Sequence, residues 1–229
     1  MVQTTENDSV LLYYPLDMRK KSTNKILRRY TDLPALVGLL KEKKITLLDP
    51  QSWDDSNDSY YLKLYQEKKD LLSVLALCFT QASETYHHWR VFASGSSGVC
   101  LSFRRDELLD AVRGVPGLQA KAVRYLRLDQ IRDRDLAVRD LPFLKRYAFG
   151  NEDEFRMIYE STTESLTSLD VAIPMKCIDR ITLSPWIHPR LSDYVKELLR
   201  SIDSCSGIRF ARSTLIGNEE WKELGQTAS

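Results

Sequence analysis

Short apolar runs bounded by turn-forming residues predict the strands in the first half of the chain. The longest run, residues 73–80, is almost continuously apolar, which is typical of a central strand buried on both faces. Shorter runs predict further strands at residues 10–14, 24–30, 45–48 and 99–103. The strands are therefore spread along the sequence rather than gathered in one segment.

Apolar positions at helical spacing separate these strands. The first helix is expected to follow Asp32, a capping residue, with Pro34 in its first turn and an apolar stripe over residues 36–40. Similar patterns predict helices at residues 60–72, 85–93, 106–112, 190–202 and 218–224. Residues 129–147 are expected to form one or two helices, broken before Pro142.

Four more strand-like runs lie in the second half of the chain, at residues 120–126, 149–160, 178–183 and 208–216. Strands and helices alternate irregularly, and no strand–helix unit or other repeat recurs. This order predicts an α+β fold in which a mixed, largely antiparallel central sheet is flanked by helices.

A single domain is expected over residues 1–229, because no linker rich in Pro, Gly or Ser divides the chain. With 43% hydrophobic residues, the chain can bury a substantial core. We expect disorder at residues 1–9, the core at residues 10–217, and a terminal helix and tail at residues 218–229.

The charges balance, with 33 Lys and Arg against 32 Asp and Glu, which disfavours a protein devoted to coating DNA or a membrane surface. They are nevertheless unevenly placed. Residues 119–147 hold eight basic side chains against four Asp, and residues 151–170 then hold six acids and one Arg. Such neighbouring runs form either a phosphate-binding wall facing a carboxylate site or two solvated faces.

Cysteine spacing and hydropathy exclude several classes of protein. The four cysteines are widely spaced, without a Cys-x-x-Cys pair or a histidine at ligand spacing, so no metal site is expected. No apolar stretch has the length of a membrane span or the form of a signal peptide. These features predict a cytoplasmic protein with reduced cysteines and no membrane partner.

The most informative segment is residues 151–159. In a strand, the alternation of side chains places Phe155, Met157 and Tyr159 on the core face. Glu152, Glu154 and Arg156 then share the other face, with the two carboxylates about 7 Å apart. An enzyme could use one carboxylate to hold a sugar hydroxyl and the other to orient a nucleophile. The alternative is an exposed face on which Arg156 partly neutralises Glu154.

Three further segments carry candidate residues. Of Arg28 and Arg29, adjacent on an early strand, one must point inward and needs an anionic partner, either a nucleotide phosphate or an Asp or Glu of the same chain. Trp53 stands in an acidic turn-rich loop and could wall a pocket, although the loop is expected to serve mainly as a turn and helix cap. The histidines in residues 87–90 are each expected to be ordinary surface or core residues rather than catalysts.

The order of these segments resembles a large bacterial family catalogued as domain of unknown function 2971. The resemblance runs from about Lys25 to about Leu215. It is carried by Arg29-Tyr30, by the loop at residues 50–56, by Cys78-Phe79-Thr80, by Trp89 with the following Gly98-Val99-Cys100-Leu101, and by residues 152–156. The loop lacks the second proline of the family pattern, and Phe stands at positions 92 and 155 where the family often has Tyr.

The same order of motifs is similar, more distantly, to that of ADP-ribosyltransferases. This resemblance implies that NAD is a substrate, that Glu154 is the catalytic carboxylate and that Glu152 orients the acceptor. It also implies that Arg29 holds a phosphate and that Tyr30, Trp53 or Trp89 stacks on a ring, with Arg156 beside them at the nucleotide.

Three functions remain open at this point. The leading hypothesis is an ADP-ribosyltransferase-like toxin or phage-defence effector acting on a protein or a nucleic acid. The first alternative is a non-catalytic binding or regulatory module, in which Glu152, Glu154 and Arg156 form ion pairs and leave no open cleft. The second is a metal-dependent nuclease using Asp54, Asp55 and Glu154.

Overall fold

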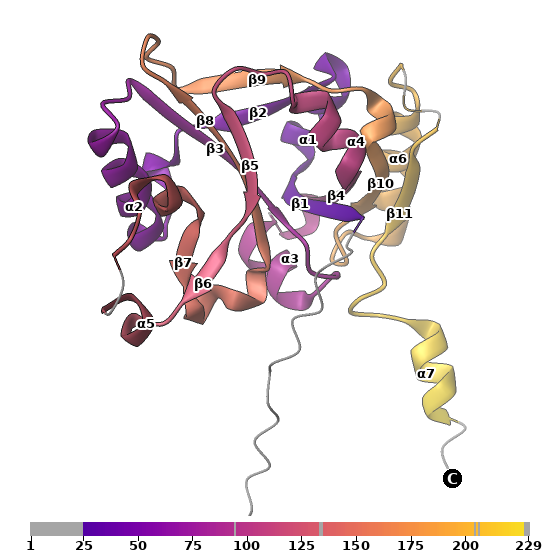
Figure 1. The fold of residues 1–229 in the computed structure, drawn as a ribbon. Helices are drawn as coiled ribbons and strands as arrows, with labels where there is room; N and C mark the ends of the chain where they lie inside the picture. Colours follow the sequence, from indigo (N-terminus) through magenta and orange to yellow (C-terminus); the bar gives the residue numbers. More distant parts are fainter. Residues whose placement is uncertain (1–24, 94, 133–134, 204, 206, 227–229) are drawn as a thin grey trace, which may run out of the picture.

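The fold is that of a single α+β domain, as the sequence pattern predicts (Figure 1). The computed structural model describes residues 25–93, 95–132, 135–203, 205 and 207–226. The strand expected at residues 10–14 and the disorder expected at residues 1–9 lie outside these residues. Among the described residues, no helix is both long and apolar enough to cross a membrane.

Nine of the described strands form one sheet, which is antiparallel except at one edge. Its main path runs β11 (Arg209–Arg212), β10 (Ile178–Leu183), β4 (Gly98–Arg104), β1 (Ile26–Asp32), β3 (Ser73–Thr80), β2 (Lys44–Leu48) and β9 (Ser168–Ala172). Off this path, β8 (Glu154–Ser161) pairs with β3 and with β5 (Leu118–Ala122). Two short parallel strands, β6 (Arg124–Leu126) and β7 (Leu144–Arg146), stand apart from the sheet.

The sheet is split along one edge of β3. On its other edge β3 pairs with β8 over its whole length, from Ser73 to Thr80. On the split edge it pairs with β1 only at Thr80, opposite Arg28, and with β2 only at Ala76, opposite Leu48. The sheet therefore opens along this edge of β3. One part of it contains β1, β4, β10 and β11, and another contains β3, β8 and β5.

The predicted faces of β8 are correct within the strand, but Glu152, expected on the face of Glu154 and Arg156, lies before the strand in a 3₁₀ helix. Phe155, Met157 and Tyr159 belong to the main hydrophobic core, together with Leu75, Leu77 and Phe79 of β3. Glu154 and Arg156 lie on the opposite face, because successive side chains of a strand point to opposite sides.

Seven α-helices are described, six of them near the sheet and the last, α7, projecting away from it (Figure 1). They are α1 (Leu33–Glu42), α2 (Ser56–Lys68), α3 (Tyr86–Phe92), α4 (Arg105–Val112), α5 (Leu128–Arg132), α6 (Pro189–Arg200) and α7 (Glu219–Gln226). The predicted cap of α1 is confirmed: Asp32 accepts a hydrogen bond of 2.9 Å from the backbone N of Ala35, and Pro34 lies in the first turn. Asp55 caps α2 in the same way, through the backbone N of Asn57 and of Asp58.

The helices expected over residues 129–147 are wrong for most of that segment. In the described part of the segment, the one α-helix is α5, and a 3₁₀ helix at Val138–Phe143 and β7 come after it. Pro142 has no backbone N–H and restricts the residue before it, which disfavours an α-helix there. Leu141 and Phe143 are instead buried against α2, and this packing sets the local conformation.

Other boundaries differ in smaller ways. The strand expected at residues 120–126 is divided between β5 and β6. The strand expected at residues 149–160 begins only at Glu154, because residues Tyr147–Glu152 form a 3₁₀ helix that ends at Asp153, whose φ is 42°. The edge strand β9 is absent from the expectations, since its sequence SLDVA carries little apolar signal.

Candidate functional site

A cavity of about 640 Å³ lies where β3 parts from β1 and β2. Arg28, Arg29 and Tyr30 of β1 line one part of it, and Glu152 and Glu154 line another. The two segments are more than 120 residues apart in sequence, and the strand order β1–β3–β8 brings them to the same hollow. The early arginines and the late pair of acids therefore share one cavity.

Arg29 reaches across the split in the sheet. Its Nη1 donates a hydrogen bond of 3.3 Å to the carbonyl oxygen of Cys78, on the open edge of β3. Burial lowers the pKa of its guanidinium, although the neighbouring Cys78 and Asp32 oppose that effect. Arg28 donates from Nη1 to the carbonyl oxygen of Ala82 at 2.8 Å. Neither arginine has an ion pair with a carboxylate among the described residues.

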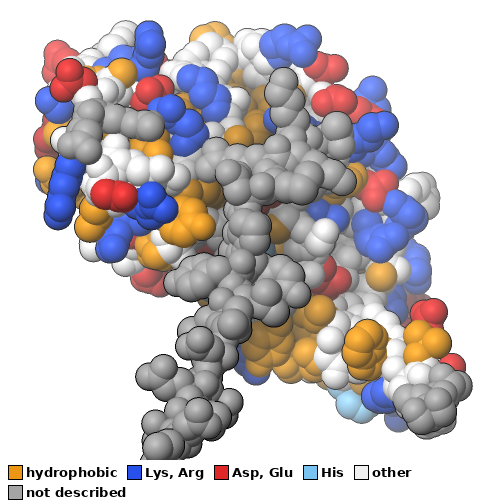
Figure 2. All heavy atoms as spheres, turned by 60° about the horizontal axis from the view of Figure 1, so that its bottom comes forward, with side chains coloured by type: hydrophobic (Ala, Val, Ile, Leu, Met, Phe, Trp, Pro, Cys, Tyr) orange, Lys and Arg blue, Asp and Glu red, His pale blue; other side chains and the backbone are white. Residues whose placement is uncertain are grey.

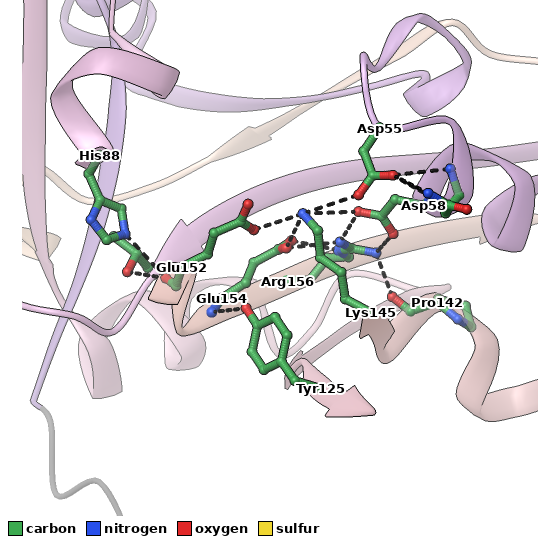
Figure 3. Close-up of polar contacts among 11 residues, drawn as sticks. Asp55, Asp58, His88, Tyr125, Pro142, Lys145, Glu152, Glu154 and Arg156 are labelled. Atoms are coloured by element: carbon green, nitrogen blue, oxygen red, sulfur yellow. Dashed lines mark hydrogen bonds and ion pairs between the residues drawn. The ribbon is translucent and has the colours of Figure 1, made fainter. Parts of the chain in front are cut away.

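Arg156 is completely buried and joins α2 to β8 (Figure 3). It donates from Nε to Glu154 at 2.7 Å and from Nη2 to the other oxygen of the same carboxylate at 3.0 Å. Nη1 and Nη2 also donate to the two oxygens of Asp58, at 2.8 and 2.6 Å, and Nη1 donates to the carbonyl of Pro142 at 2.9 Å. All of its nitrogens are therefore engaged within the protein.

Lys145 of β7 lies among four carboxylates, as Figure 3 shows. Its Nζ lies 2.7 Å from Glu152, 3.5 Å from both Glu154 and Asp58, and 4.0 Å from Asp55. With Arg156, the network holds two cations against four carboxylates. This end of the cavity is therefore net negative when all four acids are ionised.

The two glutamates differ in proton affinity. Burial alone would raise the pKa of Glu154, but the charge and hydrogen bonds of Arg156, with the charge of Lys145, lower it to about 2. Burial raises the pKa of Glu152, and Lys145 only partly opposes the effect. Glu154 is thus a fixed anion at neutral pH, whereas Glu152 holds a proton more readily than an ordinary glutamate.

Aromatic side chains border the cavity on two sides. Tyr30 lines it and stacks on the ring of His88, with centroids 5.4 Å apart. Trp53 lines it beside Arg156, whose guanidinium carbon lies 5.1 Å from the centre of the Trp53 ring. His88 is held by the hydroxyl of Thr85 at 2.5 Å and by the carbonyl of Glu152 at 3.3 Å. Burial lowers the pKa of His88, which favours its neutral form.

The structure brings together most of the predicted site residues. Arg29, Tyr30, Trp53, Glu152 and Glu154 all line the cavity. Trp89 does not, because it is fully buried and its indole donates to Glu84 at 2.6 Å. Arg156 lies beneath the cavity wall rather than in it, since its partners enclose it. We therefore leave Trp89 and Arg156 out of the residues proposed to touch a ligand.

Two residues of the network are missing from the sequence-based candidates. Lys145 belongs to the basic run of residues 119–147, and nothing in that run distinguishes it from its exposed neighbours. Asp58 belongs to the acidic loop that was expected to serve as a turn and cap, a role that Asp55 fills. A carboxylate site facing basic residues was one of the two interpretations of the charged runs at residues 119–147 and 151–170, and neither interpretation singled out Lys145.

The ion pairs expected for a purely structural cluster are present. Glu154 pairs with Arg156, and Glu152 pairs with Lys145. That alternative also predicted that no open cleft would remain, and on this point it is wrong, because Glu152 and Glu154 both line the cavity. The cluster thus combines a structural arginine with carboxylates that a ligand can reach.

No group of three or more His, Cys, Asp or Glu side chains in the described part of the chain is arranged to hold a metal ion. The four cysteines are all free thiols. Burial raises the pKa of Cys78 and, to about 12, that of Cys100, so both remain protonated at neutral pH.

No family model and no curated protein matches the chain, and the resemblance to domain of unknown function 2971 stays a prediction. Solved structures of DarT from Thermus sp. 2.9 are similar to it. The DarT complex with NAD+ gives a TM-score of 0.43 at 13% identity, over 83% of this chain and 96% of DarT. The complexes with ADP-ribosylated ssDNA and with carba-NAD+ also give 0.43, at 11% and 12% identity. At these values the likeness does not identify the activity of this chain.

Proposed function

We propose that the protein is an NAD-dependent ADP-ribosyltransferase, of the kind that serves as a toxin or phage-defence effector, with a protein or a nucleic acid as acceptor. The observation that supports it is that Arg28 and Arg29 line the same cavity as Glu152 and Glu154. At about 640 Å³, the cavity is within the range of about 300–1,000 Å³ typical of small-molecule sites.

The polarity of the cavity matches that of NAD+. Arg29 of β1 offers a guanidinium group suited to the pyrophosphate, since one arginine can donate hydrogen bonds to two phosphate oxygens at once. The network around Lys145 carries two more carboxylates than cations, which favours the positively charged nicotinamide ring. Tyr30 and Trp53 provide aromatic surfaces on which a flat ring can stack.

The roles of the two acids follow from their proton affinities. In the transfer, the bond between ribose C1′ and the nicotinamide nitrogen breaks, nicotinamide leaves with the bonding electrons, and positive charge develops on the ribose. Glu154, held ionised by Arg156, accepts a hydrogen bond from a ribose hydroxyl and stabilises that charge. The acceptor atom then bonds to C1′, and Glu152 takes its proton, because a raised pKa suits a general base.

Purified protein incubated with NAD labelled in the adenylate part and with cell extract tests the proposal. We expect label to appear on a macromolecule and free nicotinamide to be released. Glu154→Gln should reduce the rate by at least about 100-fold, since a preorganised group at the reacting centre typically contributes that much. Glu160→Gln is the matched control, because Glu160 lies on the same strand but pairs with Lys69 outside the cavity.

Full activity of Glu154→Gln would exclude the mechanism. If the unsubstituted protein does not bind NAD and does not consume it, the proposed function is excluded.

The second candidate is a non-catalytic binding module, which is favoured by the ion pairs of Glu154 and Glu152. It predicts that Glu154→Gln lowers the thermal denaturation midpoint. It also predicts that the unsubstituted protein does not turn over NAD, even where NAD binds.

A further inference from the structure

A second cavity, of about 230 Å³, opens over β1, β4 and β10. Arg28, Ser102, Arg180 and Thr182 line it. Arg28 also lines the larger cavity, so the two hollows share one arginine as a common wall. The network of Glu152 and Glu154 has no part in this second cavity.

Strand pairing explains why arginines gather here. In the register of the sheet, Arg28 of β1 lies opposite Ser102 of β4, and Ser102 lies opposite Arg180 of β10. Arg180 in turn lies opposite Arg209 of β11. Directly paired residues of adjacent strands point to the same face of a sheet, so the three arginines project from one face. With strands about 4.8 Å apart, Arg28 and Arg180 stand about 10 Å apart at their Cα atoms, with Ser102 between them. A register shift between Ile178 and Arg180 marks the same place.

The acids of the second cavity are already engaged. Asp179 pairs with both Arg104 and Arg209. Glu84 accepts hydrogen bonds from the indole of Trp89 and from the hydroxyl of Ser213. Arg180 is exposed, and its side chain has no hydrogen bond or ion pair among the residues the structure describes. The charged residues that line the cavity are Arg28, Arg180, Glu84 and Asp179, and neither acid forms an ion pair with Arg28 or Arg180, because Asp179 is paired with arginines outside the lining.

In Figure 2, several Lys and Arg side chains, with some Asp and Glu among them, lie on the side of the molecule on which Figure 1 places β10 and β11. Like charges side by side on a sheet destabilise it unless an anion lies between them. The guanidinium groups of Arg28 and Arg180 are suited to bind a phosphate from two sides, and the hydroxyls of Ser102 and Thr182 on the cavity floor can add hydrogen bonds.

We propose that the second cavity is a binding site for a phosphate group, held by Arg28 and Arg180 over Ser102 and Thr182. Its volume is below that of a typical pocket for a drug-sized molecule, which limits the bound part to a phosphate or a sugar phosphate. The assignment stands apart from ADP-ribosyl transfer, since it uses neither glutamate.

Titration of the full chain with inorganic phosphate, ribose 5-phosphate and ribose, followed by NMR shifts of backbone amides, tests the site. We expect inorganic phosphate and ribose 5-phosphate, but not ribose, to shift the amides of Ser102, Arg180 and Thr182. Arg180→Gln should weaken binding by at least about ten-fold, because a hydrogen bond to a charged group is lost. Arg190→Gln is the control, since Arg190 is exposed on α6 and its side chain has no bonded partner in the described part of the chain.

Tighter binding of ribose 5-phosphate than of inorganic phosphate identifies a sugar phosphate as the ligand, and equal affinity identifies phosphate alone. Either result supports the site. Equal binding by the unsubstituted protein and by Arg180→Gln, or no shift at these amides at low salt, would overturn it. Arg180→Gln should keep any NAD consumption, and Glu154→Gln should keep phosphate binding, so this proposal and the proposed function fail independently.

Discussion

Arg156 shows how one buried charge decides the stability of its surroundings. It is fully buried and satisfies the carboxylates of Asp58 and Glu154. Arg156→Met would leave both acids buried without this partner, which typically costs about 3–5 kcal/mol. We expect urea denaturation to show a loss of that size in the free energy of unfolding. Arg113→Met is the control, since Arg113 and Asp110 form an exposed pair, worth about 0–1 kcal/mol.

A loss below about 1 kcal/mol in Arg156→Met would mean that Lys145 alone neutralises the two acids. That result would also weaken the proposed division of roles, because Arg156 is the main cause of the low pKa of Glu154 after burial is taken into account. The proposed division of roles instead predicts that Arg156→Met leaves Glu154 no more acidic than an ordinary glutamate.

At the scale of elements, Gly117 fixes the start of β5. Its φ is +76°, and a Cβ there would collide with the carbonyl oxygen of Glu160. The backbone N of Glu160 also donates to the carbonyl of Gly117 at 3.0 Å, which closes the β5–β8 pair. Gly117→Ala should therefore destabilise the fold by about 1–3 kcal/mol in urea denaturation.

Gly38→Ala makes the same chemical change without the strain. Gly38 lies inside α1, nothing lies within 4 Å of an added Cβ, and alanine favours a helix by about 0.5–1 kcal/mol. We expect this variant to be as stable as the original chain or more so. Equal effects of the two substitutions would show that the left-handed conformation at position 117 is not required.

The elements that the sequence predicts well are those whose own residues decide them. The run at residues 73–80 is apolar enough to be a central strand in any arrangement, and the alternation after Glu154 sets the faces of β8. Residues 129–147 are different, because Leu141 and Phe143 are held by α2, more than 70 residues earlier. A pattern read along the chain does not contain that contact, and helix-forming residues there give way to tertiary packing.

At the scale of the whole molecule, the candidate site depends on strand order. The sequence supplies Arg29, Glu152 and Glu154 as candidates, but their meeting requires β3 to lie between β1 and β8 and to part from β1. Lys145 enters the same cavity from β7, which is outside the main sheet. Local patterns contain neither fact, so the sequence offers these residues as candidates but not the arrangement that brings them to one cavity.

The network that joins α2, β7 and β8 should also govern stability in acid. The pKa of Glu154 falls from an ordinary 4.5 to about 2 on folding, so its contribution is present above pH 4.5 and is lost as pH falls toward 2. A shift of this size corresponds to roughly 3 kcal/mol. Glu152 acts in the opposite direction, because its raised pKa favours the folded state at low pH and that contribution is lost as pH rises.

Urea denaturation at a series of pH values from 5 to about 2 separates the two acids. In Glu154→Gln, the free energy of unfolding should fall less steeply with acid than in the unsubstituted protein. Glu152→Gln should keep the steep fall, since Glu154 and Arg156 remain paired. Equal slopes in all three proteins would show that Glu154 is not held as an anion in the fold, and the carboxylate proposed to stabilise the ribose would then lack its fixed charge.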